Sequence, residues 1–141
     1  MTGTNRLIIA LDVPTTDDAR RAVAAIGGDG VFYKIGYQLM PLGGVELARE
    51  LSAAGKKVFL DFKFHDIGAT VERGVASVVK LGGDFLTVHA EPDVLKGAVA
   101  GRGGDKRLKI LGVTVLTSLT QESLADSGIA MRLEDLVLKR A

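Results

Sequence analysis

Apolar runs rich in β-branched residues recur along the chain, and each has the length of a buried β-strand. They follow one another at intervals of about 25 residues, which is the size of a strand, a loop and a helix. The five runs are RLIIALD (6–12), VFYKIG (31–36), KKVFLDF (56–62), DFLTVHA (84–90) and LKILGVTVL (108–116). The pattern predicts a serial β/α repeat.

Stretches typical of helices separate these runs. Residues 15–26 open with TTDD, where a threonine can cap the helix and acids favour its first turn. Residues 43–54 and 71–81 are each followed by a glycine, which commonly stops a helix. The last residues, LEDLVLKRA, also have helical character. Because near-continuous apolar strands are joined through helices, we expect them to be parallel and covered on both faces.

Two architectures fit such strands, a doubly wound open sheet and a (β/α) barrel. Polar residues at or after the ends of the runs help to choose. They are Asp12, Lys34, Asp61, Lys63, His89, Thr117 and Ser118. The carboxyl ends of all strands meet at one face of a barrel, whereas strands far from the switch point of an open sheet do not converge. We therefore favour an α/β fold of the (β/α)8 TIM-barrel type.

The length of the chain limits this prediction. A complete barrel has eight strands and typically about 250 residues, whereas this chain has 141 residues and five such runs. We expect residues 1–141 to form a single domain, the amino-terminal portion of a partial barrel. Open edges and uncovered inner layers would be unfavourable, so we expect the other strands in a longer chain, a second fragment or a partner.

The segment LDFKFHDIG places three charges where a buried strand ends. Asp61 and Lys63 are two residues apart and point to the same side of a strand, and Asp66 lies on the following loop. An acid, base, acid array favours a protonated lysine beside ionised carboxylates. It suits a cofactor-free decarboxylation, in which a carboxylate leaves and a carbanion is protonated in place. A structural network of buried ion pairs is the alternative interpretation.

Composition narrows the classes of partner. The net charge is +1 and no basic run is interleaved with aromatic residues, so we expect no nucleic-acid partner. The chain has no cysteine, which excludes disulfides and thiolate metal sites and is compatible with a reducing cytosol. The start, MTGTNR, lacks the apolar core of a signal peptide, and no apolar run approaches the roughly 18 residues of a membrane span. We expect a cytoplasmic protein.

Five blocks of the sequence together resemble one known family. The blocks LIIALDV, FYKIGYQL, VFLDFKFHDIGATV, LTVHA and GVTVLTSL occur in this order and spacing, and they resemble the orotidine 5′-phosphate decarboxylase family. The third block carries the specific signature, Asp-x-Lys-x-x-Asp-Ile with a threonine three residues on. The resemblance covers nearly the entire chain. It implies a homodimeric barrel enzyme, a carbon–carbon lyase that makes uridine 5′-monophosphate in pyrimidine biosynthesis without metal or coenzyme.

The resemblance implies roles for the residues of the third block. Lys63 would donate the proton to C6 of the pyrimidine, and Asp61 would crowd the leaving carboxylate. Asp66 would complete the charged array and reach the active site of the partner subunit together with Ile67 and Thr70. The substrate would be the small nucleotide orotidine 5′-monophosphate.

Other residues receive binding roles from the same resemblance, and each keeps an alternative. Asp12 and Lys34 would hydrogen-bond the ribose, although Asp12 could be a helix N-terminal acid and Lys34 could extend from a strand edge to solvent. Thr117 or Ser118 would contact the base, or could cap the next segment. The two histidines, His65 and His89, are interpreted as structural or supporting groups.

The chain departs from the family pattern in three places. Gly68 and Ala69 stand where the family commonly has Pro-Asn, which would loosen the turn that places Thr70. TSL replaces the frequent TSM, a volume-conserving change. The phosphate-binding loop and arginine of the family's later strands are not in this sequence, so we expect little or no activity from residues 1–141 alone.

Two other functions remain open. One is a Mg²⁺-dependent sugar-phosphate decarboxylase or synthase of the same superfamily, which shares the Asp-x-Lys-x-x-Asp spacing. The other is a non-catalytic half barrel that binds a partner through its exposed edges. KFHDI and TVLTS favour the orotidine enzyme over the first, and the acid–lysine array argues against the second.

Overall fold

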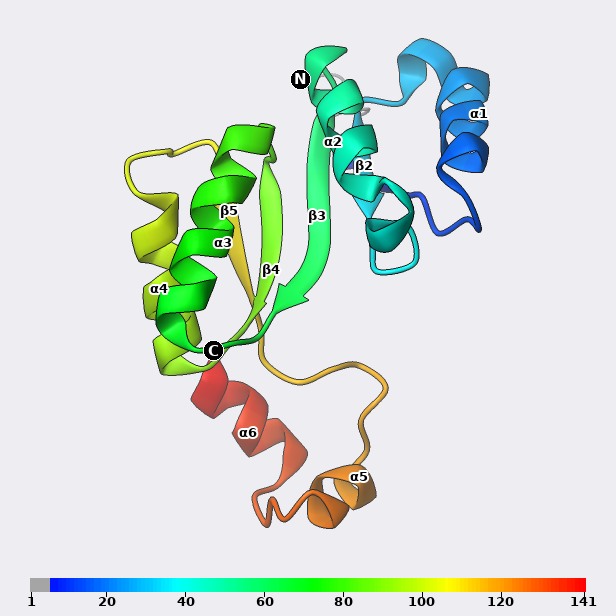
Figure 1. The fold of residues 1–141 in the computed structure, drawn as a ribbon. Helices are drawn as coiled ribbons and strands as arrows, with labels where there is room; N and C mark the ends of the chain where they lie inside the picture. The colour runs from blue at the N-terminus through cyan, green and yellow to red at the C-terminus, as the bar shows by residue number, and fades with distance from the viewer. Residues whose placement is uncertain (1–5) are drawn as a thin grey trace.

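The computed structural model of the protein describes residues 6–141 and contains one five-stranded parallel sheet (Figure 1). The first five residues, part of the segment considered for a signal peptide, lie outside the described residues. The strands are β1 (Ile9–Ala10), β2 (Phe32–Ile35), β3 (Lys57–Phe64), β4 (Phe85–His89) and β5 (Lys109–Val113). All five predicted runs therefore contain a strand, although only two residues of the first run are paired with a neighbour.

The order of the strands separates the two architectures that the sequence left open. The sheet runs β1-β2-β3-β4-β5, so every strand pairs with its neighbour in the chain, and all pairs are parallel. A doubly wound sheet reverses its order at a switch point, whereas a barrel winds in one direction. The consecutive order is that of a (β/α) barrel, of which this chain supplies five strands.

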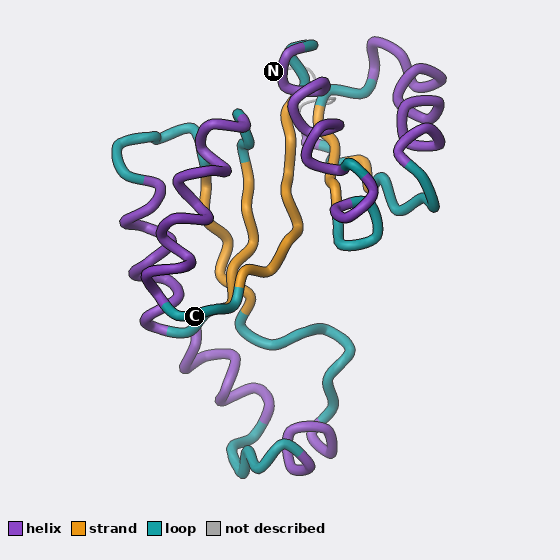
Figure 2. Tube along the Cα trace, viewed as in Figure 1, coloured by secondary structure: helices purple, strands orange, loops and turns teal. Residues whose placement is uncertain are grey.

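Helices follow the strands in sequence. Their bounds are α1 (Thr16–Ile26), α2 (Gly44–Ala53), α3 (Gly68–Leu81), α4 (Pro92–Arg102), α5 (Gln121–Asp126) and α6 (Leu133–Arg140), with short 3-10 turns η2 (Gly27–Asp29) and η3 (Met40–Leu42). In Figures 1 and 2, α1 and α2 lie beside β2 and β3, α3 and α4 lie beside β4, and α5 and α6 lie beyond the carboxyl end of β3. None of the described helices is both long and apolar enough to cross a bilayer.

The two faces of the sheet differ in what covers them. Along β3, Val58, Leu60 and Phe62 are buried in the core that the sheet forms with its helices. Phe59 and Asp61 alternate with them and are only half-buried. Because side chains alternate across a strand, these two point to the opposite, inner face of the barrel. The Asp61 carboxylate thus lies on the inner face, away from the helices.

Three helical regions differ from the sequence-based expectation. Helix α3 begins at Gly68 rather than at residue 71, so the segment expected to be a loose turn is its first turn. Helices α4 and α5 were not predicted. The two glycines of GAVAG in α4 are poor helix formers and weakened its helical signal. The structure explains these residues, because a Cβ at Gly97 would lie 3.0 Å from the Gly68 carbonyl carbon. Small residues let the backbones of α3 and α4 approach closely.

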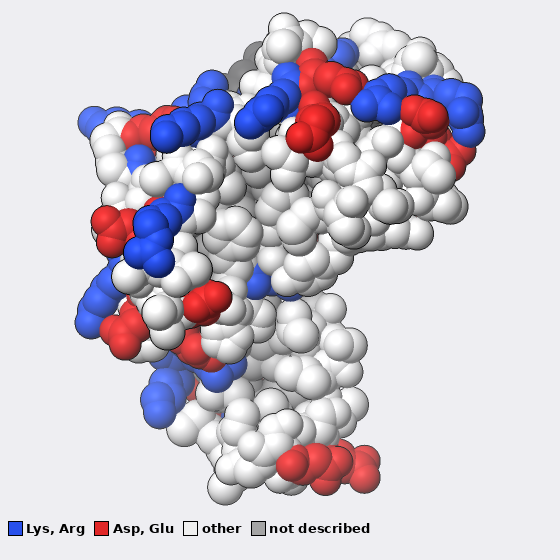
Figure 3. Space-filling model, viewed as in Figure 1, with Lys and Arg blue, Asp and Glu red and all other residues white. Residues whose placement is uncertain are grey.

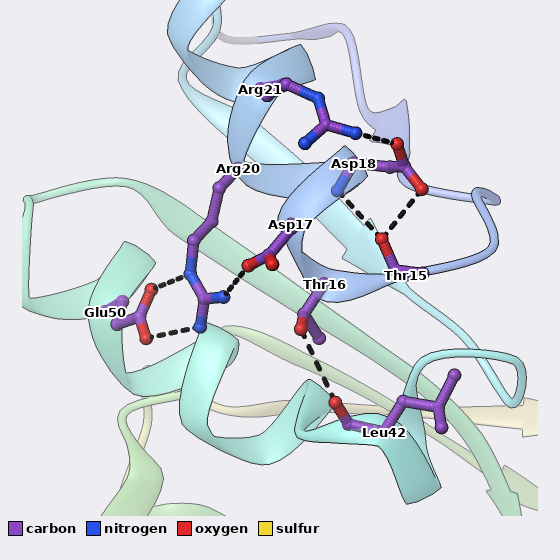
Figure 4. Close-up of polar contacts among 8 residues, drawn as sticks. All are labelled: Thr15, Thr16, Asp17, Asp18, Arg20, Arg21, Leu42 and Glu50. Carbon is purple, nitrogen blue, oxygen red and sulfur yellow. Dashed lines mark hydrogen bonds and ion pairs between the residues drawn. The ribbon is translucent and has the colours of Figure 1, made fainter.

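A polar network joins the first two helices on the molecular surface (Figure 4). The Arg20 guanidinium donates to both carboxylate oxygens of Glu50, at 2.9 and 2.8 Å, and to Asp17 at 2.8 Å. These hydrogen bonds raise the pKa of Arg20 and lower that of Glu50. The Thr15 hydroxyl caps α1 by accepting from the Asp18 amide. Charges of both signs lie side by side over this region in Figure 3, as expected for a solvated face.

One buried polar atom in the core lacks a partner. The Tyr33 side chain is fully buried, and its hydroxyl makes no hydrogen bond to the described residues. Burial raises the pKa of this hydroxyl. We expect Tyr33→Phe to raise the free energy of unfolding by about 1 kcal/mol, because it removes an unsatisfied buried group. Urea unfolding measures the change, with the exposed Tyr37→Phe as the neutral control; a loss of stability in Tyr33→Phe would contradict the prediction.

Candidate active site

Four charged residues converge on the inner face near the carboxyl ends of β1, β2 and β3. The Lys63 ammonium lies 2.8 Å from Asp61 Oδ1, and the Lys34 ammonium lies 3.5 Å from Asp61 Oδ2. Lys34 is also 3.5 Å from Asp12 Oδ2. We call these residues, Asp12, Lys34, Asp61 and Lys63, the charged cluster. It alternates acid and base across three neighbouring strands, so each ammonium group faces a carboxylate.

Asp61 is the centre of the charged cluster and its least exposed member. Its side chain is 16% exposed, against 63% for that of Asp12. Burial alone would raise the pKa of Asp61, but hydrogen bonds from Lys63 and Thr87 and the charges of Lys63 and Lys34 hold that pKa below its usual value. A lowered carboxyl pKa stabilises the fold above the unfolded pKa, and this contribution is lost as the pH falls through the folded pKa.

The backbone of β3 is irregular where it carries the cluster. Leu60 pairs with Leu86 and Phe64 with Val88, so β3 takes four residue steps while β4 takes two. Such a bulge re-aims side chains next to functional sites. Within it, Lys63 has a φ of 44°, the one positive φ among the described non-glycine residues. A non-glycine residue in this region is strained, and such strain is concentrated at functional sites.

A cavity of about 350 Å³ opens beside Lys63. It is lined by residues from the end of β3, from η3 and the segment before it, and from α3: Tyr37, Met40, Phe62, Lys63, Phe64, His65, Asp66, Thr70, Val71 and Gly74. The Lys63 ammonium lies 5.9 Å from the centre of the Tyr37 ring. A mostly apolar pocket with one lysine and one carboxylate at its wall has the composition of a small-molecule site.

Asp66 and Thr70 line the cavity, Ile67 follows Asp66 in the sequence, and none of the three belongs to the charged cluster. The Asp66 carboxylate accepts from the Ile67 amide at 2.7 Å and makes no ion pair with any residue of 6–141. Ile67 is 71% exposed, unusually high for isoleucine. The Thr70 amide donates to the Ile67 carbonyl in the first turn of α3. Within this chain Lys34 and Asp12 extend the Asp61–Lys63 pair, and the expected contribution of Asp66 to the array of a partner subunit stays a prediction.

Thr117 and Ser118 lie in the turn that follows β5. No hydrogen bond between described residues joins them to the charged cluster. The alternative that they cap the next helix is wrong, because Thr120 caps α5 in a capping box with Ser123. Their contact with a pyrimidine base stays a prediction.

The structure also argues against the alternative interpretations of Asp12 and Lys34, whose contacts with a ribose stay a prediction. Asp12 is not a helix N-terminal acid, because Thr15 caps α1 and the acids of its first turn are Asp17 and Asp18. Lys34 does not extend freely into solvent, because its ammonium lies between the carboxylates of Asp12 and Asp61 and its side chain is only 25% exposed.

The two histidines stack on each other beside the cluster. Their ring centres are 4.5 Å apart and the planes are inclined by 22°. His65 Nε2 lies 2.8 Å from Glu91, whose other oxygen is 3.8 Å from Arg140 of α6. Burial, followed by the charge of His65, lowers the pKa of His89. These contacts tie α6 to the ends of β3 and β4.

Sequence reasoning missed two residues of this region, Thr87 and Tyr37. The Thr87 hydroxyl donates to Asp61 Oδ1 at 2.9 Å. A signal was present, since Thr87 alternates with His89 along β4 and is polar within an apolar run. Tyr37 follows β2 at the cavity wall and is 56% exposed. Its distance from Lys63 depends on the path of the loop, which no sequence pattern indicated.

Comparison with known proteins gives a consistent result. The chain matches the family described as Orotidine 5′-phosphate decarboxylase / HUMPS over residues 5–141. Orotidine 5′-phosphate decarboxylase of Rhodopseudomonas palustris (strain BisB5) is 56% identical over 137 residues, which are 97% of this chain and 58% of that protein. The enzyme of the same name from Caulobacter vibrioides (strain NA1000 / CB15N) is 54% identical over 140 residues, 99% and 60% of the two chains. The chain thus spans about three fifths of the length of these relatives.

Solved structures agree with the fold. The structure of orotidine 5′-phosphate decarboxylase from Lactobacillus acidophilus has a TM-score of 0.88 and 32% identity, over 96% of this chain and 64% of that chain. Orotidine 5′-monophosphate decarboxylase from Methanocaldococcus jannaschii, complexed with inhibitor BMP, has a TM-score of 0.67 and 31% identity, over 77% and 51%. These similarities and the strand order confirm a partial (β/α) barrel.

Proposed function

The chain belongs to the orotidine 5′-phosphate decarboxylase / HUMPS family, and from that premise we propose that its protein converts orotidine 5′-monophosphate to uridine 5′-monophosphate and CO₂. The relatives named above are called orotidine 5′-phosphate decarboxylases. Since the chain spans only part of their length, the proposal concerns the protein to which these residues contribute the charged cluster.

The proposed reaction breaks one carbon–carbon bond and forms one carbon–hydrogen bond. The substrate carboxylate leaves C6 of the pyrimidine as CO₂, and the electron pair stays on C6. The Lys63 ammonium then donates a proton to C6, and the amine regains a proton from solvent. Asp61 repels the substrate carboxylate before it leaves, and Lys63 stabilises the negative charge that develops. No external oxidant or reductant is needed.

The observation that carries this proposal is the contact between Lys63 and Asp61. Their 2.8 Å contact holds an ammonium group against a carboxylate that keeps its negative charge, as its lowered pKa indicates. A fixed proton donor beside a fixed negative charge is what an in-place decarboxylation and protonation requires. In the proposed complex Asp12 and Lys34 bind the ribose hydroxyls, and Thr117 or Ser118 contacts the base.

Turnover and metal dependence test the proposed reaction together. We expect the full-length protein to release CO₂ from orotidine 5′-monophosphate, with unchanged turnover after treatment with EDTA. Both Asp61 oxygens already face ammonium groups, at 2.8 and 3.5 Å, which disfavours a divalent cation there. Loss of turnover on chelation, restored by Mg²⁺, would instead support the sugar-phosphate enzymes of the superfamily.

We also propose a homodimer in which Asp66, Ile67 and Thr70 reach the partner's site. The exposed Ile67 supports this, because covering its apolar side chain with another chain would remove that surface from water. Ile67→Asp is expected to weaken the dimer by at least tenfold, since an unpaired charge would be buried. Sedimentation velocity measures the change, with Leu138→Asp, a substitution of an exposed leucine on α6, as the control. Equal dissociation of both variants would contradict the proposed interface.

A further inference from the structure

Apart from tyrosine, Thr87 is the one residue with a polar side chain that is buried among residues 6–141, with 6% of its surface exposed. It lies in the middle of β4, where it pairs with Leu111 of β5. Its neighbours along the strand, Leu86 and Val88, belong to the hydrophobic core. Because side chains alternate, Thr87 points to the opposite face, where its buried hydroxyl is unfavourable unless its hydrogen bonds are made.

Both hydrogen bonds of the Thr87 hydroxyl go to the charged cluster. The Lys63 amide donates to Thr87 Oγ1 at 3.0 Å, and the hydroxyl donates to Asp61 Oδ1 at 2.9 Å. The directions follow from chemistry, because an amide can only donate and an ionised carboxylate can only accept. The oxygen that accepts from Thr87 also accepts from the Lys63 ammonium at 2.8 Å. One side chain thus holds the backbone of Lys63 and the carboxylate of Asp61.

The Thr87 hydroxyl lies where the pairing between β3 and β4 is irregular. Between the pairs Leu60–Leu86 and Phe64–Val88 the ladder of β3 and β4 is interrupted. The Lys63 amide lies in this gap and its residue has a φ of 44°. A strained conformation persists only where its surroundings hold it. The Thr87 hydroxyl replaces the strand partner that the Lys63 amide has lost.

We infer that Thr87 is a positioning residue of the proposed decarboxylase, which holds Lys63 in its left-handed conformation and Asp61 against the Lys63 ammonium. The inference rests on the proposed function, since the geometry that Thr87 maintains is that of the proposed proton donor. Thr87 acts through Lys63 and Asp61 and does not itself touch the reacting carbon.

Substitutions that separate the hydroxyl from the shape of the side chain test this role. In the full-length protein, Thr87→Val keeps the volume and removes both hydrogen bonds, whereas Thr87→Ser keeps the hydroxyl. We expect Thr87→Val to lower kcat by about 10²-fold, comparable to the loss of one preorganised donor, with KM changed much less. Thr87→Ser is expected to recover most of that loss. Should Thr87→Val not fold, Thr87→Ala replaces it with the same expectation.

A measurement without turnover separates this inference from the proposed function. The ¹³C NMR titration of the Asp61 carboxyl should show a higher pKa in Thr87→Val than in the wild type, and a value near the wild type in Thr87→Ser. Unchanged kcat and unchanged titration in Thr87→Val would overturn the inference, as would a serine variant as slow as the valine variant. Absence of decarboxylation in the wild type would refute the proposed function, while the titration still decides whether Thr87 holds Asp61.

Discussion

Replacing Lys63 with alanine is expected to lower the kcat for orotidine 5′-monophosphate by about 10⁴-fold or more. General acid catalysis by a positioned side chain contributes about 10²–10⁴-fold, and stabilisation of developing charge adds to it. Alanine removes both contributions, because Lys63 is the ammonium group in direct contact with Asp61. The release of ¹⁴CO₂ from carboxyl-labelled substrate is sensitive enough to measure a loss of this size.

Two further variants make the result specific for the proton. Lys63→Arg keeps a positive charge beside Asp61 but presents a guanidinium that does not readily release a proton, so it is expected to be nearly as slow as alanine. Lys57→Ala removes a lysine from the other end of the same strand, where its ammonium lies over the Phe32 ring, and should leave kcat within about twofold. Substantial turnover in Lys63→Ala would show that the catalytic assignment is wrong.

Gly97→Ala is expected to cause a large loss of stability, because it places a methyl group between α4 and the backbone of α3. The new Cβ would lie 3.0 Å from the carbonyl carbon of Gly68 and closer still to its oxygen, and both are backbone atoms of α3. No side-chain rotation relieves such a contact, so α3 and α4 must move apart. Overpacking of this kind costs about 3 kcal/mol, which corresponds to a fall in Tm of about 10 °C for a chain of this size.

The matched control lies just beyond the same helix. A Cβ at Gly104 meets no atom within 4 Å, so Gly104→Ala should change the unfolding free energy by less than about 0.5 kcal/mol. Thermal unfolding followed by circular dichroism compares the two variants. Equal Tm values would mean that the close approach of α3 and α4 does not limit stability. Gly97→Ala is also expected to disturb the cavity wall, because Asp66 and Thr70, which line the cavity, lie at the start of α3.

The strands were predictable because their signal is local. Each of the five runs contains a strand, since a strand buried on both faces must be apolar along its whole length. Helix α4 escaped prediction because the glycines that permit its close packing on α3 are poor helix formers. Tertiary contacts overrode propensity there, and a single sequence does not contain those contacts.

The role of Gly68 shows the same limit at a single residue. Sequence reasoning interpreted it as a loosened turn before Thr70. In the structure it is the first residue of α3, and a Cβ there would lie 2.9 Å from the Asp93 carbonyl oxygen of α4. Gly68 therefore leaves space for the neighbouring helix α4. This contact depends on residues about 25 positions further along the chain.

By itself the sequence determined that parallel strands alternate with helices and that Asp61 and Lys63 point to one side of the third strand, because both conclusions depend only on the period of two and on local composition. The tertiary structure decided which residues far apart in the sequence come into contact. Consecutive strand order makes the sheet a barrel segment and brings Asp12 and Lys34 to Asp61. The bulge in β3 turns the Lys63 amide toward Thr87. Each of these follows from pairing between strands, a property that no single strand carries.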